Sequence, residues 1–132
     1  MLTAITIESR KQQEMIDISA EVQKAIRASG ILEGSALLFV SHTTAAVTIN
    51  ENADPDVVRD MLMELGKVVP DDDGYKHLEG NSAAHLKSSL VGCAQSLIIH
   101  QGSALLGTWQ GIYFCEFDGP RRRSVQLKLS AE

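Results

Sequence analysis

The stretch SALLFVSHTTAAVTIN, from Ser35 to Asn50, contains two apolar runs separated by a polar break. The runs, residues 35–41 and 45–50, are short, rich in residues that favour strands, and too apolar to lie on an exposed face. We therefore predict that they form two central strands of a sheet. The break places His42, Thr43 and Thr44 between these strands, which makes it the first candidate site.

The segment before this stretch is predicted to form two strands and a helix. Residues 2–8 place Leu2, Ala4 and Thr6 on one face and Thr3, Ile5 and Ile7 on the other, so the alternation leaves the buried face open, while the β-branched content favours a strand. Residues 15–18 are predicted to be its hairpin partner. Apolar residues then recur at three-and-four spacing over residues 20–29, which predicts a helix capped by Ser19 and ended by Gly30.

Asp54 and Pro55 mark the start of a second helix, because a carboxylate suits the N-cap and proline suits the first helical position. We expect this helix to end at Gly66. The polar connection over residues 69–79 is longer than most loops, so it is a candidate functional loop. The remaining elements are a short helix that is capped by Asn81 or Ser82, runs through Leu90 and is closed by Gly92, and three strands over residues 96–100, 108–117 and 124–129.

This order of elements has too few strand–helix–strand crossovers for a parallel sheet. The 132 residues are enough for one domain with a sizeable core, and too few for two. The sequence therefore predicts a single-domain α+β fold, with about three helices and a largely antiparallel core.

The net charge of the chain indicates which classes of partner it is expected to bind. The chain has 12 Lys and Arg against 17 Asp and Glu, a net charge of -5, so its field repels the phosphate backbone of nucleic acids. No apolar stretch is long enough for a membrane span, and the N-terminal residues lack the pattern of a targeting segment. We expect a cytoplasmic protein that binds neither nucleic acid nor membrane, with Cys93 and Cys115 reduced and mostly buried.

Three of the four histidines stand beside carboxylates, which makes this part of the chain the best candidate for chemistry. Imidazoles and carboxylates are the usual ligands of borderline divalent ions, so His42, His77 and His85 are predicted to share a zinc or magnesium ion. The histidines could instead satisfy backbone carbonyls. The polar residues that cluster with them are Thr43, Glu51, Asn52, Asp54, Glu79, Asn81, Glu116 and Asp118.

Two other kinds of chemistry stay open. A histidine beside a carboxylate can act as an acid or a base, and this suits His77 with Glu79, or His42 with a carboxylate of residues 51–54. Asp54 is equally well explained as a helix cap. Arg121 and Arg123 can lie on one face of a strand, and together with the helix start at Asn81 they could hold an anion; the alternative is a solvated sheet edge.

Three long segments together resemble the YjbQ-like family, which carries the label secondary thiamine-phosphate synthase. The segments are HTTAAVTINENADPDV from His42, VPDDDGYKHLEGNSAAHLKSSLVG from Val69, and LGTWQGIYFCEFDGPRRR from Leu106. Because they occur in the family's order and span most of the chain, the resemblance covers essentially all of it.

The resemblance implies a compact α+β protein with a β-sandwich-like core that assembles as a homotrimer. It also implies a weak thiamine-phosphate synthase activity, which joins a hydroxymethylpyrimidine diphosphate to a thiazole phosphate and releases pyrophosphate. The site residues that the family motifs indicate are His42, Thr43, Glu51, Asn52, Asp54, His77, Glu79, His85, Trp109, Gln110, Glu116, Asp118 and Arg121. The resemblance implies that the histidines of this set contact a metal or an anion.

The mechanistic hypothesis uses these residues together. Arg121 or Arg123 and a divalent ion would neutralise the leaving pyrophosphate, while a histidine manages the proton. The alternative is a binding protein without turnover, which holds a metal or a small phosphorylated metabolite. A purely structural assembly protein is a third reading, and it leaves the clustered polar residues unexplained.

Overall fold

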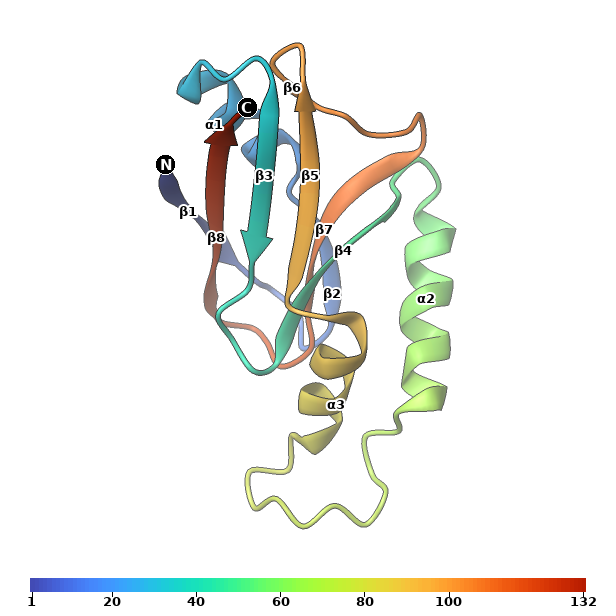
Figure 1. The fold of residues 1–132 in the computed structure, drawn as a ribbon. Coiled ribbons are helices and arrows are strands. Elements are labelled where there is room, and N and C mark those ends of the chain that lie inside the picture. Colours follow the sequence, from blue (N-terminus) through green and yellow to red (C-terminus); the bar gives the residue numbers. More distant parts are fainter.

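The computed structural model describes all of residues 1–132 and contains two antiparallel sheets and three helices (Figure 1). The larger sheet has the strand order β1-β8-β3-β5-β6, and the smaller one has the order β2-β7-β4. The strands are β1 (Leu2–Glu8), β2 (Glu14–Asp17), β3 (Gly34–Phe39), β4 (Ala45–Glu51), β5 (Ala94–His100), β6 (Ser103–Ala104), β7 (Gln110–Glu116) and β8 (Arg122–Ala131). The predicted antiparallel α+β fold is therefore confirmed.

The main core lies between the two sheets and α1 (Ser19–Ser29). In β1, Ile5 and Ile7 face inward while Leu2, Ala4 and Thr6 are exposed, which settles the face that the alternation left open. Both central runs of the opening stretch contribute to this core. Its other members include Val22, Ile26, Leu38, Val47, Leu97, Ile112, Phe114, Val125 and Leu127.

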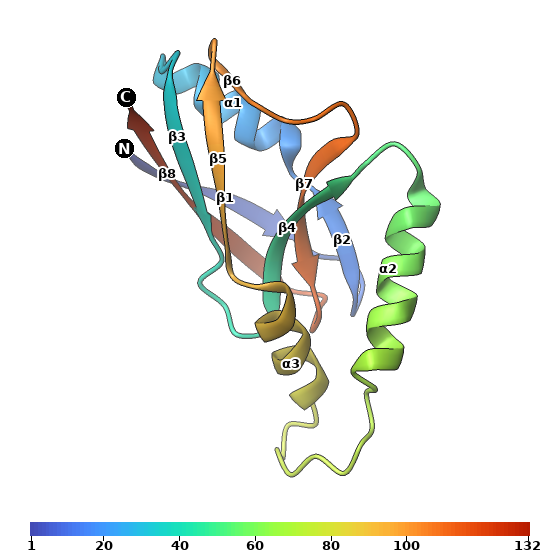
Figure 2. The same ribbon diagram turned by 45° about the vertical axis from the view of Figure 1, so that its right-hand side comes forward.

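Helix α2 (Pro55–Val68) and helix α3 (Ser82–Val91) lie at the other face of the smaller sheet (Figure 2). They cover a second apolar cluster of Ala46, Ala84, Tyr113, Cys115 and Phe117. No residue of α2 is fully buried, so this helix packs only loosely on the cluster. None of the three helices is long and apolar enough to cross a lipid bilayer.

The predicted hairpin of residues 2–8 and 15–18 is wrong, because the two strands belong to different sheets. β1 pairs with β8, and β2 pairs with β7. β1 and β2 do not pair with each other across the polar turn, because each pairs with a long apolar strand from the C-terminal part of the chain.

Several details of the helices and strands also differ from the predictions. Ser19 is the first residue of α1 and does not cap it, since its hydroxyl accepts a hydrogen bond from the Ile112 amide at 2.9 Å. Helix α2 continues past Gly66 to Val68, because a glycine with ordinary helical backbone does not end a helix. The strand β6 (Ser103–Ala104) was not predicted. Asp54 does cap α2, accepting from the Asp56 amide at 2.9 Å.

Candidate functional site

His42 lies in the connection between β3 and β4, beside the start of β8. The Ser124 amide donates a hydrogen bond to Nε2 of His42 at 3.0 Å. Burial and the positive charge of Arg123 lower the pKa of His42, and Arg121 acts in the same direction. The ring is therefore held in place by backbone, and its neutral form is favoured.

A cavity of about 510 Å³ adjoins this ring. Its volume falls in the range of small-molecule sites. We call it the His42 pocket, and it is lined by His42, Thr43, His85, Ser88, Ser89, Gly92 and Cys93. The structure thus brings two of the three predicted histidines, and Thr43, to one cavity.

His77 does not line the His42 pocket, but its ring contacts His85, which does. A second cavity of about 490 Å³, here called the His77 pocket, is lined by Tyr75, His77, Ser82, His85 and Leu86. The rings of His77 and His85 meet edge to face, with centroids 5.6 Å apart. Two adjoining cavities therefore share His85, and His77 and His42 lie on different sides of it.

A buried ion pair lies under the site. Arg123 and Glu116 have side chains that are 2% and 0% exposed, and Nε of Arg123 donates to Oε1 of Glu116 at 2.9 Å. The Ser9 hydroxyl donates to the same carboxylate at 2.7 Å, and Arg123 also donates to the Thr44 hydroxyl at 2.8 Å. Burial would raise the pKa of Glu116, but the hydrogen bonds from Arg123 and Ser9 outweigh it and lower the pKa.

This network changes the role predicted for Arg123. Its guanidinium is buried and bound to Glu116 and to Thr44, so it does not face a ligand. Arg123 instead acts on the site through its charge, which reaches His42. Glu116 is likewise a structural partner of Arg123, where the sequence suggested a residue that lines the site.

Arg121 is half exposed and bonded to Asp118. Its guanidinium donates to Oδ2 of Asp118 at 3.0 Å, and the Asn81 amide donates to the same oxygen at 2.8 Å. Asn81 begins α3 without a side-chain cap, and its Oδ1 is buried without a partner. Asn81 and Asp118 also line a third cavity of about 250 Å³, together with Gln12, Asp71, Glu79, Gly80, Ala83, Ala84 and Phe117.

Five predicted site residues lie at the far end of the smaller sheet. Glu51 pairs with Gln110, while Ala45, six residues earlier on β4, pairs with Glu116. At about 3.3 Å per residue, the two ends are roughly 20 Å apart. A single chain therefore does not bring this end to the histidines. The five residues are Glu51, Asn52, Asp54, Trp109 and Gln110.

Their local contacts explain several of these five residues without a ligand. Asp54 caps α2, and the Asn52 amide donates to Asp17 at 3.1 Å. The Gln110 side chain accepts from the Gly107 amide at 2.8 Å. Trp109 is 62% exposed, unlike Tyr113, Phe114 and Phe117, which are buried as core residues.

The predicted shared metal does not fit the chain as it stands. No group of three or more His, Cys, Asp and Glu side chains lies close enough together to hold a metal ion. The Nε2 lone pair of His42 is already engaged by the Ser124 amide. We therefore derive no chemical step through a metal, and metal binding stays a prediction.

The acid–base pairs predicted for these histidines are also not formed within the chain. The one side-chain hydrogen bond of His42 is with Ser124, and none joins His77 to Glu79. His100 does bond a carboxylate, Glu33, at 3.0 Å, although no acidic residue is near it in sequence. Glu33 comes from the neighbouring loop before β3, so sequence distance hid this pair.

The predicted burial of Cys93 is wrong, and the buried position of Lys87 was not predicted. Cys93 is exposed and lines the His42 pocket, whereas Cys115 is buried as predicted, and this burial raises its pKa to about 12. Lys87 has a side chain only 2% exposed, and its Nζ donates to Gln13 at 2.8 Å. Lys87 lies on the inward face of α3. In the sequence, only the small apolar residues Ala83 and Ala84 indicated that this face is buried.

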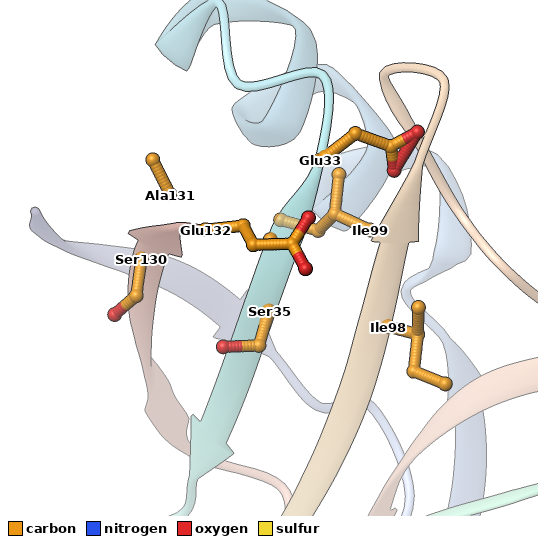
Figure 3. Close-up of a pocket in the computed structure, with 8 residues that line it drawn as sticks. Glu33, Ser35, Ile98, Ile99, Ser130, Ala131 and Glu132 are labelled. Carbon is orange, nitrogen blue, oxygen red and sulfur yellow. The ribbon is translucent and has the colours of Figure 1, made fainter.

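A further cavity, shown in Figure 3, lies far from the histidines. It occupies about 360 Å³ at the ends of β3, β5 and β8, with Glu33 and Glu132 in its wall. Its charged groups are carboxylates and it holds none of the predicted site residues. It therefore does not compete with the His42 pocket as the candidate site.

Comparisons with known proteins agree on one family. Residues 3–132 match the model of a family described as UPF0047 protein YjbQ-like. The chain is 52% identical to the UPF0047 protein YugU of Bacillus subtilis, over 98% of each chain. It is 51% identical to the UPF0047 protein MJ1081 of Methanocaldococcus jannaschii, over 98% of this chain and 94% of the relative.

Solved structures show the same similarity. An uncharacterized conserved protein of the YjbQ/UPF0047 family from Clostridium acetobutylicum superposes with a TM-score of 0.95 at 52% identity, covering 97% of this chain and 99% of that one. The hypothetical protein APE1520 from Aeropyrum pernix has a TM-score of 0.95 at 30% identity, covering 100% and 99%. The resemblance inferred from the three sequence segments is confirmed.

Proposed function

Since the chain belongs to the UPF0047 YjbQ-like family, we propose that its His42 pocket binds a small phosphorylated metabolite. The observation that carries this proposal is the lining of the pocket. Its seven residues include two histidines and no carboxylate, in a protein whose net charge is -5. An anion entering this pocket meets no direct charge repulsion from its walls.

The surrounding charges support the same ligand. Burial is the largest cause of the lowered pKa of His42, and Arg123 and Arg121 lower it further, which means that positive potential reaches the ring. Glu116 opposes this effect, but its influence on the ring is smaller than that of Arg123. A phosphate group next to His42 would therefore be stabilised by charge, even though the guanidinium of Arg123 does not touch the pocket.

Donors at the rim of the pocket would supply the direct contacts. The hydroxyls of Ser88 and Ser89 are committed to the carbonyls of Ala45 and His85, at 2.7 and 3.0 Å. The exposed Thr43 hydroxyl has no partner within the chain and can donate to a ligand. We assign ligand contact to His42, Thr43 and His85.

A second candidate is the thiamine-phosphate synthase activity that the resemblance implies. The observation that favours it is the pair of adjoining cavities, about 510 and 490 Å³, which share His85 and offer room for two substrates. In that reaction the carbon–oxygen bond of the pyrimidine diphosphate breaks, a carbon–nitrogen bond to the thiazole forms, and pyrophosphate leaves with the bonding electrons. The donors of the His42 pocket would stabilise the leaving pyrophosphate.

Assembly as a homotrimer is part of the proposal. The outer face of the larger sheet exposes Leu37 at 43%, Phe39 at 43% and Ile98 at 61%. β3 and β5 pair directly, so these side chains lie on neighbouring strands. Light scattering on wild type and on Ile98→Lys tests this: a trimer that the substitution dissociates supports it, and a monomeric wild type contradicts it.

Calorimetric titration with inorganic phosphate and with pyrophosphate tests the binding function. We expect saturable binding by wild type and a loss of at least about 10-fold in affinity for His42→Ala, the size expected for a hydrogen bond to a charged group. His100→Gln is the matched control, since His100 lies outside this pocket. Absence of binding by the wild type would overturn the proposal.

The synthase candidate needs its own assay. Purified protein with both substrates should form thiamine phosphate, and His42→Ala and Arg121→Ala should lose this product while they stay folded. Elemental analysis of protein purified without an affinity tag belongs with this assay, because it tests the predicted metal directly. No product above a control without protein would eliminate the synthase activity and leave the binding function standing.

A further inference from the structure

We propose that His42 acts as a neutral hydrogen-bond donor, through Nδ1–H, to an oxygen atom of the phosphate group in its pocket. The inference rests on the proposed function, because it names the contact by which the pocket would recognise its ligand. It narrows the metal or anion contact that the family resemblance implies for His42 to one hydrogen bond, donated from a stated nitrogen to an anion.

The hydrogen bond from Ser124 fixes the tautomer of the ring. A backbone amide can only donate, so the nitrogen that it reaches, Nε2 of His42 at 3.0 Å, must be unprotonated. A flipped ring would place a carbon at that position and leave the amide without an acceptor. In the neutral ring the proton is therefore on Nδ1.

The Nδ1 atom is free and accessible. It makes no hydrogen bond within the chain, and Asn81 Oδ1 is the only fully buried side-chain nitrogen or oxygen atom without a partner. Nδ1 of His42 must therefore have access to solvent. Since His42 also lines the pocket, a ligand is the natural acceptor for this proton.

The charged groups around the ring favour the neutral donor. Burial, Arg123 and Arg121 oppose a second proton, and together they outweigh Glu116, which would favour one. A second proton would also have to replace the hydrogen bond from Ser124. His42 therefore has no free lone pair with which to bind a metal or to act as a base. It has one N–H, which can donate to an acceptor.

Two substitutions separate this role from a structural one. The side-chain nitrogen of His42→Asn sits near the position of Nδ1, so it can keep the donor in the pocket. The longer side chain of His42→Gln reaches the position of Nε2, so it can keep the acceptor for the Ser124 amide and loses the pocket donor.

The experiment measures inorganic phosphate binding to wild type, His42→Asn and His42→Gln. We expect affinity within about 3-fold of wild type for Asn and a loss of about 10-fold or more for Gln. If the hydrogen bond to Ser124 were all that mattered, the order would be reversed, and that result would overturn the proposal. Thermal unfolding of each variant shows that the comparison is made between folded proteins.

Nitrogen-15 spectra of the imidazole rings give a second, ligand-free readout. Signals that disappear in His42→Asn belong to His42, and we expect them to show a protonated Nδ1 and an unprotonated Nε2. A proton on Nε2 would overturn the proposal whether or not phosphate binds. The expected tautomer in a wild type that binds no phosphate would leave the proton assignment standing and contradict the proposed function.

Discussion

Arg123 and Glu116 form an ion pair in the interior, with side chains that are 2% and 0% exposed. The pair joins the start of β8 to the end of β7, and it holds Ser9 and Thr44 beside it. Because β8 also carries the Ser124 amide that binds His42, the pair fixes the backbone on which the candidate site depends.

Removing one member of this pair should destabilise the protein severely. We expect Arg123→Ala or Glu116→Ala to lower the free energy of unfolding by about 3–5 kcal/mol, because each leaves an uncompensated buried charge. Arg122→Ala is the control, because the side chain of Arg122 is 75% exposed and its Nε lies 3.6 Å from Oε1 of the exposed Glu8. Loss of such an exposed ion pair should change the free energy of unfolding by less than about 0.5 kcal/mol. Urea unfolding measures the stability of the buried-pair variants and of the control. Equal losses of stability would contradict a buried ion pair between Arg123 and Glu116.

The same pair predicts a loss of stability in acid. The pKa of Glu116 is lowered in the folded state, so the folded protein holds its proton less tightly than the unfolded chain. The stabilisation is fully present above the ordinary carboxyl pKa of about 4.3 and is lost as the pH falls through the lower folded value. Urea unfolding between neutral pH and pH 3 should show this slope, and Glu116→Gln should reduce it. An unchanged slope in the variant would assign the acid sensitivity to other carboxylates.

The two cysteines provide a chemical probe of the pocket. Cys93 is exposed in the His42 pocket, whereas Cys115 is buried and its pKa is raised to about 12. Iodoacetamide should therefore label one cysteine in the native wild type and none in native Cys93→Ser. In urea it should label both cysteines of the wild type. Pyrophosphate should slow the native reaction by filling the pocket. Labelling at an unchanged rate with saturating pyrophosphate would place the anion elsewhere.

Two glycines of different surroundings make a matched stability test. A Cβ on Gly34 would stand 2.1 Å from the Ser130 carbonyl oxygen, while one on Gly66 meets nothing within 4 Å. We expect Gly34→Ala to cost about 1–3 kcal/mol of stability, because β3 and β8 must move apart. Gly66→Ala, within α2, should stabilise by about 0.5–1 kcal/mol. Similar effects of the two substitutions in thermal unfolding would contradict the close approach of β3 to β8.

The sequence predicted most elements of this fold because their signals are local. Asp54 and Pro55 start α2 with the expected cap, and both apolar runs of the opening stretch are central strands. The hairpin of β1 and β2 was wrong because strand pairing depends on distant partners, here β8 and β7. Local periodicity shows which face of a strand is apolar, and it does not show which strand lies beside it.

The candidate site was harder to predict for the same physical reason. His42, Thr43 and His85 meet in one pocket, but Arg123, which the sequence placed at the ligand, acts on His42 only through its charge. Nothing in the sequence indicates that Arg123 turns inward to Glu116, seven residues earlier. The choice between a ligand contact and a buried pair depends on the three-dimensional position of Thr44 and Ser9.

A crystal structure of the protein grown with tungstate, an electron-dense analogue of phosphate, tests whether His42 binds the anion. We expect an anomalous peak in the His42 pocket, with a tungstate oxygen about 3 Å from Nδ1 of His42 and the Ser124 hydrogen bond to Nε2 intact. A pocket without tungstate, while the anion occupies the Asn81 region or the exposed Arg122, would contradict it.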